Sequence, residues 1–485
     1  MASYAHDEAQ AYFQRGLAAK DVVLTGTEPA SDGEAAALLF GFGRAQGSTG
    51  QLADAWETLR RAFDYYAEAG DVTMAIAVAE YPLLFVAGLT SAVHMVERTL
   101  SLVPADSHEA GRLLSRYGLL VNLEAGDHER ASDAFDRALA IAEREGDVAL
   151  EMRTLANAAD TDWYQLRSQE VLRKSLRAIE LARRANDPRT EAWPRFLSTF
   201  ESVVACDLTG ASEHAQEMLA QTERLQDRGL QALACLANAI AFRAQGDWLA
   251  TREYLDRGLN LETKQSWILS YLALTEYETG NFRQGKTYVE QILEVMRATT
   301  PGPTGEYHFP AWVIPVVCRI SGVVDGLDIS REAAQVVLSS PYLTPRLASL
   351  RVGNALIAVL ENDVTGAKER YDDLLQRPIE WAASDLAAGW PSTHRVLGML
   401  AHTMGTLDQA AAHFEDSLDL CREAGFGPEL AWTCCDYADM LLQRNSDGDR
   451  SKANSLLDES LAVSTELGMR PLMERVLSRI EILSA

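Results

Sequence analysis

The sequence predicts an all-α protein, a right-handed superhelical solenoid of tandem antiparallel helix pairs. Three observations lead to this prediction. Apolar residues recur at intervals of three and four along almost the whole chain, the spacing of amphipathic helices, and strand-like alternation is almost absent. Helical stretches alternate with short turns rich in Gly, Asp and Asn. The 485 residues exceed the ~100–200 of one compact domain, a limit that does not apply to a repeat array.

A recurring pattern of small and bulky residues predicts how the helix pairs nest. A small residue in the first helix is followed by a turn glycine, by a small residue five positions later, and by an aromatic residue or Leu four positions beyond that. The pattern occurs at Gly398, Gly405, Ala410 and Phe414, at Gly118, Gly126, Ala131 and Phe135, and at Gly43, Gly50, Ala55 and Leu59. The small residues let the two helices approach closely, the turn glycine adopts a left-handed backbone, and the large residue fills the groove between repeats.

The spacing of the turns resembles that of tetratricopeptide repeats. Gly246 and Gly280 lie 34 residues apart (280 − 246), and a tetratricopeptide unit has about 34 residues. Other intervals are slightly longer, which indicates longer helices or loops. On this template the chain has about ten helix pairs.

The N-terminal part of the chain begins with a single helix. We expect residues 1–20 to form a helix that completes or precedes the array, with Tyr12 and Leu17 on one face. A polar linker follows, and residues 34–297 are expected to form the N-terminal tetratricopeptide repeats. Neither end of the chain has the polar face of a capping repeat, so we expect it to be part of a longer protein.

One stretch interrupts the repeat pattern. Residues 298–345 contain Pro301-Gly302-Pro303 and further aromatic and proline residues, and we expect an irregular, degenerate repeat or an insertion there. Three interpretations remain open: a bend in the superhelix, a loop that lines a pocket, or a tolerated insertion in a loop. Residues 346–485 are expected to form the C-terminal tetratricopeptide repeats.

Composition and charge argue against several classes of binding partner and of cellular location. A formal charge of −26 repels phosphate backbones and anionic lipids, so we expect no direct binding of nucleic acid; it favours cationic partners or serves solubility alone. The six cysteines form no C-x-x-C pair, which is typical of a reducing compartment. No signal peptide is visible, and the most apolar long window, 73–96, is interrupted by Glu80 and Pro82. We therefore expect a cytoplasmic protein that does not enter a membrane.

Some motifs that would indicate catalysis or a cofactor are explained by the repeat pattern, and the others are missing from the sequence. The segment Gly280–Thr287 matches the phosphate-loop pattern G-x-x-x-x-G-K-[ST], but a helical segment precedes it where a strand is needed. The histidines are scattered, and His394 and His402, eight residues apart on one helix, are interpreted as solvent-facing or satisfied in the core. No arrangement of catalytic residues stands out, so we expect a protein that is not an enzyme, with no cofactor and no metal.

The concave groove of the predicted superhelix is the candidate binding surface. A groove of aromatic and arginine side chains suits a peptide or a small polar ligand, and the alternative is that these aromatic residues only pack between repeats. The repeat register assigns the following residues to the groove: Arg153, Asp160, Trp163, Trp267, Tyr277, Arg395 and His402, with Met399 beside the last two.

The two ends of the sequence carry a more specific resemblance. Ser455–Arg479 resembles the last repeats of MalT-like members of the LuxR group and of related AAA/adenylate-cyclase regulators, and Tyr4–Leu17 is similar to the helix after their ATPase module. In that family the solenoid lies between a nucleotide switch and an output domain and senses an inducer or a protein partner. The resemblance implies a non-catalytic sensing arm of a bacterial signalling or transcriptional regulator, with a protein, a peptide or a small-molecule effector as its partner. The alternative is a free-standing tetratricopeptide adaptor that binds a peptide from a partner protein. The chain holds neither an ATPase module nor a helix-turn-helix, so ATP hydrolysis and DNA binding are not implied.

Overall fold

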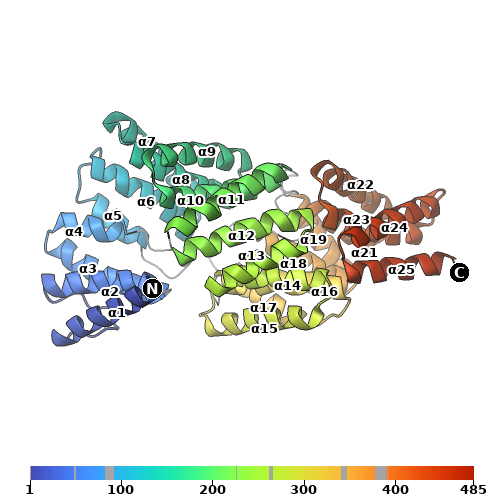
Figure 1. The fold of residues 1–485 in the computed structure, drawn as a ribbon, viewed down its shortest axis with the longest axis horizontal. Helices are drawn as coiled ribbons and strands as arrows, with labels where there is room; N and C mark the ends of the chain where they lie inside the picture. Colours follow the sequence, from blue (N-terminus) through green and yellow to red (C-terminus); the bar gives the residue numbers. More distant parts are fainter. Residues whose placement is uncertain are drawn as a thin grey trace. The chain divides into compact units, whose positions relative to one another are not determined.

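The computed structural model describes residues 2–48, 51–81, 92–225, 227–261, 266–339, 347–376, 389 and 391–484. Within these ranges the chain forms 24 α-helices and no β-strand, which confirms the predicted all-α class (Figure 1). The described residues fall into two compact units. The first holds the residues up to Gln165 together with Arg173–Pro194, and the second holds Leu166–Leu172 and the residues from Arg195 onward.

The first unit is a row of short helix pairs in which each helix packs against its neighbour in sequence. Helices α9 (Ser168–Ala185) and α10 (Pro188–Val204) are divided between the two units. The helices that lie wholly in the first unit are α1 (Ala2–Ala19), α2 (Gly33–Ser48), α3 (Leu52–Glu68), α4 (Val72–Ala79), α5 (Ala92–Leu100), α6 (His108–Ala125), α7 (His128–Glu145) and α8 (Val148–Tyr164).

The second unit continues the succession of helix pairs. Its N-terminal helices are α11 (Leu208–Leu225), α12 (Arg228–Gln245), α13 (Trp248–Leu261), α14 (Ser266–Glu278), α15 (Phe282–Ala298), α16 (Gly305–Ser321), α17 (Leu327–Leu338), α18 (Leu347–Leu360) and α19 (Val364–Leu375). Its C-terminal helices are α21 (Thr393–Met404), α22 (Leu407–Ala424), α23 (Gly427–Arg444), α24 (Asp449–Glu466) and α25 (Arg470–Ser484). The prediction of tandem helix pairs is confirmed in both units.

Glycine and aspartate together make the corners between helices. Gly126 and Gly246 end their helices with φ angles of 65° and 78°, in the left-handed region that favours glycine. The next residue in each case begins the following helix: the Asp127 carboxylate accepts the backbone N–H of Arg130, and Asp247 does the same at its corner. Many acidic residues therefore stabilise helix N-termini, where the helix dipole favours negative charge. Gly280 and Gly405 also adopt positive φ at corners, whereas Gly50 and Gly88 lie outside the described residues.

Close approach of paired helices explains the small residue of the first helix. A Cβ atom on Gly398 of α21 would lie 2.8 Å from the ring of Phe414 on α22, and one on Gly118 of α6 would lie 2.6 Å from Phe135 on α7. Both phenylalanines are buried. Each ring thus occupies the space that a glycine leaves, as the repeat pattern predicts.

The stretch 298–345, where we expected a degenerate repeat or an insertion, contains two helices in its described part, α16 and α17. Helix α16 includes Pro310 and Pro315, and most of its residues are buried. It packs against α14, α17 and α18, so α16 is part of the core of the second unit.

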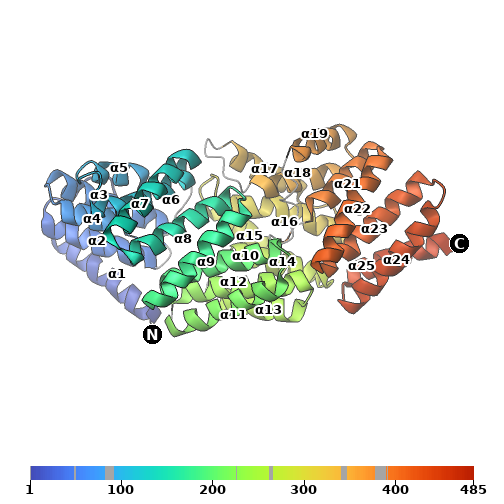
Figure 2. The same ribbon diagram turned by 90° about the horizontal axis from the view of Figure 1, so that it is seen from above.

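Helices distant in sequence also meet within the second unit. Helix α23 contacts α12, and the C-terminal helix α25 contacts α14 and α16 (Figures 1 and 2). Arg470 donates to the carbonyl oxygen of Thr279 at 3.3 Å, although the two residues lie 191 positions apart. In a simple solenoid each repeat contacts only its neighbours, so these contacts set the second unit apart. No helix among the described residues combines the length and the apolar character needed to cross a membrane.

The close contact at Gly398 generates a stability prediction. Gly398→Val introduces a side chain where the Phe414 ring lies, and overpacking of this kind costs about 1–3 kcal/mol. We therefore expect a lower midpoint of urea unfolding. The matched control is Ala412→Val, an exposed position on α22, where only the helix propensity changes, by at most about 0.7 kcal/mol. Equal losses in the two variants would contradict the proposed role of Gly398.

Candidate functional site

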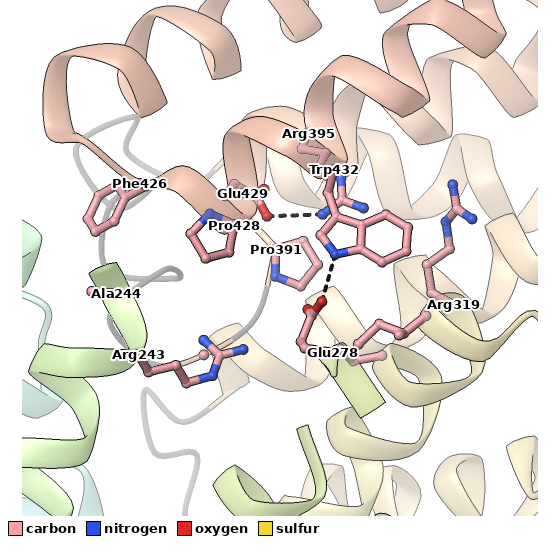
Figure 3. A pocket seen from close by; sticks show the side chains of 13 residues that line it. Arg243, Ala244, Glu278, Arg319, Pro391, Arg395, Phe426, Pro428, Glu429 and Trp432 are labelled. Carbon is pink, nitrogen blue, oxygen red and sulfur yellow. Dashed lines mark hydrogen bonds and ion pairs between the residues drawn. The ribbon is translucent and has the colours of Figure 1, made fainter. Parts of the chain in front are cut away.

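A polar pocket lies in the second unit, where helices distant in sequence meet (Figure 3). Its cavity volume is about 50 Å³. Since one water molecule needs about 10–15 Å³ measured in this way, the cavity has room for a few water-sized groups or one small anionic group. The lining residues come from α12, α14, α16, α21, α23 and the segment before α21; they are Arg243, Ala244, Glu278, Val316, Arg319, Ile320, Gly389, Pro391, Arg395, Phe426, Pro428, Glu429 and Trp432.

Arg395 of α21 is the centre of a buried ion-pair network. Its guanidinium donates to Glu429 at 3.0 Å and to Asp436 at 2.8 Å, and all three side chains are buried. Arg319 of α16 also forms an ion pair with Asp436, across 117 positions of sequence. Arg319 comes from α16, Arg395 from α21 and Asp436 from α23. The network therefore joins three of the helices that line the pocket.

Trp432 of α23 connects this network to α14 and α25. Its indole N–H donates to the Glu278 carboxylate at 3.0 Å, as Figure 3 shows. The guanidinium carbons of Arg395 and Arg475 lie 5.3 Å and 4.9 Å from the ring centroid, within the range of cation–π attraction. Arg475 also donates to the backbone oxygen of Arg319 at 2.9 Å. One aromatic side chain thus holds charged groups from three helices.

Among the described residues, positive charge is in excess around the pocket. Within that part of the chain, the lining residues and the charged side chains that contact them comprise four arginines, Arg243, Arg319, Arg395 and Arg475, and three carboxylates, Glu278, Glu429 and Asp436. This local excess contrasts with the formal charge of −26 of the whole chain. It makes the pocket a place where an anionic group is stabilised.

Several guanidinium N–H groups here have no acceptor among the described residues. They are the buried Nε of Arg243, the Nε of Arg319 and the Nη1 of Arg475. In the described part of the chain the Arg243 guanidinium makes no hydrogen bond and no ion pair, and it lies 6.0 Å and 5.9 Å from the ring centroids of Trp248 and Tyr271. A buried donor without an acceptor costs about 1–3 kcal/mol, so an acceptor supplied by a ligand has a direct energetic gain.

Burial and the neighbouring hydrogen-bond donors shift the pKa values of the three carboxylates in opposite directions. Burial raises the pKa of Glu278 and of Glu429, and Trp432 and Arg395 respectively offset part of that effect. Burial also acts on Asp436, but Arg319 and Arg395 outweigh it, so the pKa of Asp436 lies below its ordinary value. Asp436 is therefore the carboxylate held ionised by the network.

The predicted groove residues are distributed over three helices, and of these only Arg395 lines the pocket. His402 lies near the end of α21 and hydrogen-bonds with Gln443, and Met399 is buried. Tyr277 is half-buried on α14, and its ring packs at a tilt against Phe282, with 5.4 Å between the ring centroids. The next residue after Tyr277, Glu278, is the one that reaches the pocket.

The remaining predicted residues take part in aromatic packing or lie on the surface. Asp160 and Trp163 of α8 both contact Trp193: the carboxylate accepts its indole N–H at 2.9 Å, and the two rings meet edge-to-face at 6.3 Å. Trp267 of α14 packs against Phe196 and Phe309, with ring centroids 5.4 Å and 6.2 Å apart. Arg153 is exposed and donates to the carbonyl of Ala149 in its own helix.

Sequence reasoning missed most of the pocket. Arg319 and Asp436 are single charged residues inside apolar helical runs, Val316-Val317-Cys318-Arg319-Ile320 and Trp432-Thr433-Cys434-Cys435-Asp436. A charge inside such a run is costly unless it is paired. That signal alone could have singled out both residues, although not their contact with each other.

The phosphate-loop match lies at a helix corner. Helix α14 precedes Gly280, where a phosphate loop requires a strand, and Gly285 lies inside α15. A Cβ atom on Gly285 would lie 2.5 Å from the Tyr277 ring, so this glycine serves helix packing.

Glu201 of α10 is a second kind of buried carboxyl group, whose pKa is shifted chiefly by burial. Burial raises its pKa to about 7, and the Ser168 hydroxyl offsets only part of this effect. Its Oε2 atom is buried and has no hydrogen-bond partner among the described residues. The group is therefore neutral below neutral pH and costly to ionise above it.

Comparisons with known proteins give fold-level likeness alone. The sequence matches no protein-family profile, and no curated protein matches it significantly. Among solved structures, it is similar to a chain of the APC/C hetero-tetramer Cut9–Hcn1, with a TM-score of 0.40 and 13% identity over 98% of this chain and 94% of that chain. It is also similar to the TPR domain of P58(IPK), with a TM-score of 0.24 and 13% identity over 92% of this chain and 98% of that one. A designed circular tandem repeat protein follows with a TM-score of 0.15 and 13% identity over 91% and 96% of the two chains. These scores are too low to carry an argument about function.

The ion-pair network generates a prediction for Asp436. Asp436→Asn leaves Arg319 and Arg395 short of a buried counter-charge, and breaking a buried pair in this way costs about 3–5 kcal/mol. We expect a clear fall in the melting temperature. The control is Asp439→Asn on the same helix, whose pair with Arg479 is partly exposed (28% for Asp439 against 2% for Asp436) and contributes about 0–1 kcal/mol. Similar losses in both variants would show that the network adds nothing to the fold.

The pKa of Glu201 generates a prediction about pH. Between its ordinary pKa of 4.5 and about 7, the folded chain holds a proton here that the unfolded chain has released. The free energy of unfolding therefore falls as the pH rises through this window. Each unit of pKa difference corresponds to about 1.4 kcal/mol, so the whole fall is about 3 kcal/mol. Glu201→Gln, neutral at every pH, removes this fall, so we expect it to be more stable than the wild type at pH 8 and similar at pH 5.

The measurement is the melting temperature of each variant as a function of pH. The control is Glu213→Gln, an exposed position on α11. If Glu201→Gln and Glu213→Gln follow the same pH profile, the buried carboxyl is not a source of pH dependence.

Proposed function

We propose that this chain is a non-catalytic binding scaffold that senses a small anionic ligand in the pocket around Arg243, Arg319 and Arg395. The observation that carries the proposal is the excess of guanidinium groups, with buried N–H donors that have no acceptor among the described residues. A carboxylate or phosphate group would accept these hydrogen bonds and balance the charge. The cavity volume of about 50 Å³ favours a ligand that inserts one such group.

A binding role is favoured over a catalytic one by the state of the pocket carboxylates. Glu278 accepts from Trp432, Glu429 from Arg395 and the backbone of Ser392, and Asp436 from two arginines. A general base needs a free, positioned acceptor for the substrate proton. Carboxylates tied to arginine and tryptophan instead hold the wall of the pocket in place.

The proposed mechanism is a population shift. The lining residues come from α12, α14 and α16 on one side and from α21 and α23 on the other. A ligand that contacts both groups of helices binds more tightly when the two groups are packed together than when they are apart. Binding therefore shifts the population toward the packed state, by as much as the two affinities differ. This is the behaviour expected of the sensing arm of a bacterial signalling regulator, the class that the two ends of the sequence resemble. The cytoplasmic location and the absence of nucleic-acid partners stay predictions.

The test compares two arginine variants in the presence of malonate and of inorganic phosphate. We expect a saturable rise in the melting temperature of the wild type, corresponding to about 2.7 kcal/mol at a 100-fold excess over Kd. Arg243→Gln removes the guanidinium without breaking an ion pair, and we expect it to abolish the saturable part. Arg224→Gln is the control, because Arg224 is exposed on α11 and makes the same change of charge.

The control is needed because phosphate stabilises folded proteins without binding to them. An identical response of Arg243→Gln and Arg224→Gln to both anions would refute the anion pocket. A peptide that binds equally well to both variants would favour the adaptor, the alternative class.

A further inference from the structure

A group of metal-ligating side chains lies between α21 and α22, apart from the pocket lining. His394 is on α21, and His413 and Asp416 are three residues apart on α22. The ligand atoms of the three side chains all lie within 4.8 Å of one another. The i, i+3 spacing puts His413 and Asp416 on the same helix face, turned toward the helix that carries His394.

From this geometry we propose that His394, His413 and Asp416 form a binding site for a divalent transition-metal ion such as Zn²⁺, with a fourth position open to water or another ligand. Two imidazoles and a carboxylate are ligands that Zn²⁺ takes in sites of this kind. The histidines are scattered along the sequence, which predicts no metal site, and only the helix pair brings His394 and His413 together.

Distances within the group fit a single ion. The Nδ1 atom of His394 lies 3.7 Å from the Oδ2 atom of Asp416. In a tetrahedral site with bonds of about 2.1 Å, two ligand atoms lie roughly 3.4 Å apart. The Asp416 side chain is 56% exposed, so it has room to turn toward the imidazoles.

The surroundings of His413 supply the second observation. Its Nδ1 atom is buried and has no hydrogen-bond partner among the described residues. Its other ring nitrogen, Nε2, lies 2.8 Å from the hydroxyl oxygen of Tyr371 on α19. With the proton on Nε2, the ring donates to Tyr371 and leaves the Nδ1 lone pair available to an ion. Metal-bound histidines typically have a partner of this kind on the second nitrogen.

A bound ion would tie α21 to α22. Helix α19 packs against α21 (Figure 2), and its Tyr371 contacts His413. Arg395 follows His394 directly in the sequence and lines the pocket. The ion would thus fix the part of α21 that holds the centre of the ion-pair network. This consequence concerns stability and does not depend on the anion ligand of the pocket.

The test measures Zn²⁺ and Co²⁺ binding to the full chain after removal of metals with a chelator. We expect one ion per chain by calorimetry, a Co²⁺ absorption spectrum of the intensity typical of four-coordination, and a rise in melting temperature with Zn²⁺. Asp416→Asn should weaken binding at least 100-fold and abolish the spectrum. Tyr371→Phe should weaken binding about 10- to 100-fold, the range for a residue that orients a ligand.

The control is Asp419→Asn, an exposed acidic residue further along α22. It separates a specific site from loose cation binding by a chain of charge −26. Asp416 is largely exposed, so its variant is expected to fold, which the melting curve without metal checks. Equal affinities of Asp416→Asn and Asp419→Asn, or no binding to the wild type at stoichiometric concentrations, would overturn the proposal.

Discussion

The structure depends on how closely two paired helices can approach. Where Gly118 meets Phe135 and Gly398 meets Phe414, the ring of one helix lies in the space that would hold a Cβ atom on the other. The corners impose a second condition, since a left-handed residue must end one helix before aspartate can begin the next. Each repeat therefore needs only a few specified positions, and the rest of its sequence is free to vary. This freedom explains how a chain without a matching family profile still forms tandem helix pairs.

The second unit adds a constraint that a row of repeats does not need. Arg319, Trp432 and Arg475 link helices that are more than a hundred positions apart in sequence. Burying these charges has a large desolvation cost, which the ion pairs and hydrogen bonds offset only when all of them form together. The network consequently contributes more to the choice of one arrangement than to total stability. A repeat row in which α23 and α25 failed to reach α12, α14 and α16 would leave Asp436 without Arg319 and Trp432 without Glu278.

The sequence predicts the helix pairs, which local patterns determine. It does not predict the pocket, which depends on contacts between residues far apart in the chain. Helix pairs follow from apolar spacing and from turn glycines such as Gly126 and Gly405, which are visible within one repeat. The pocket depends on Glu278, Arg319 and Asp436, which are brought together by the return of the C-terminal helices, and no repeat register encodes that return. The repeat register assigns Arg395 to the concave groove, and the structure buries it against Glu429 and Asp436. The sequence pairs His394 with His402 on its own helix, and the neighbour of His394 in space is His413 on the next helix.

The charge of the whole chain and the charge of the pocket act over different distances. Exposed acidic groups repel anions, but at physiological ionic strength their field is screened beyond about 8 Å. Inside the pocket the guanidinium groups of Arg243 and Arg319 lie in a less polar environment, where hydrogen bonds to an anion are stronger than in water. A polyanion such as a nucleic acid would meet the repulsive surface along its whole length. The proposed ligand, with one small anionic group, would meet mainly the local attraction, and the acidic surface would then add selectivity for ligands of that size.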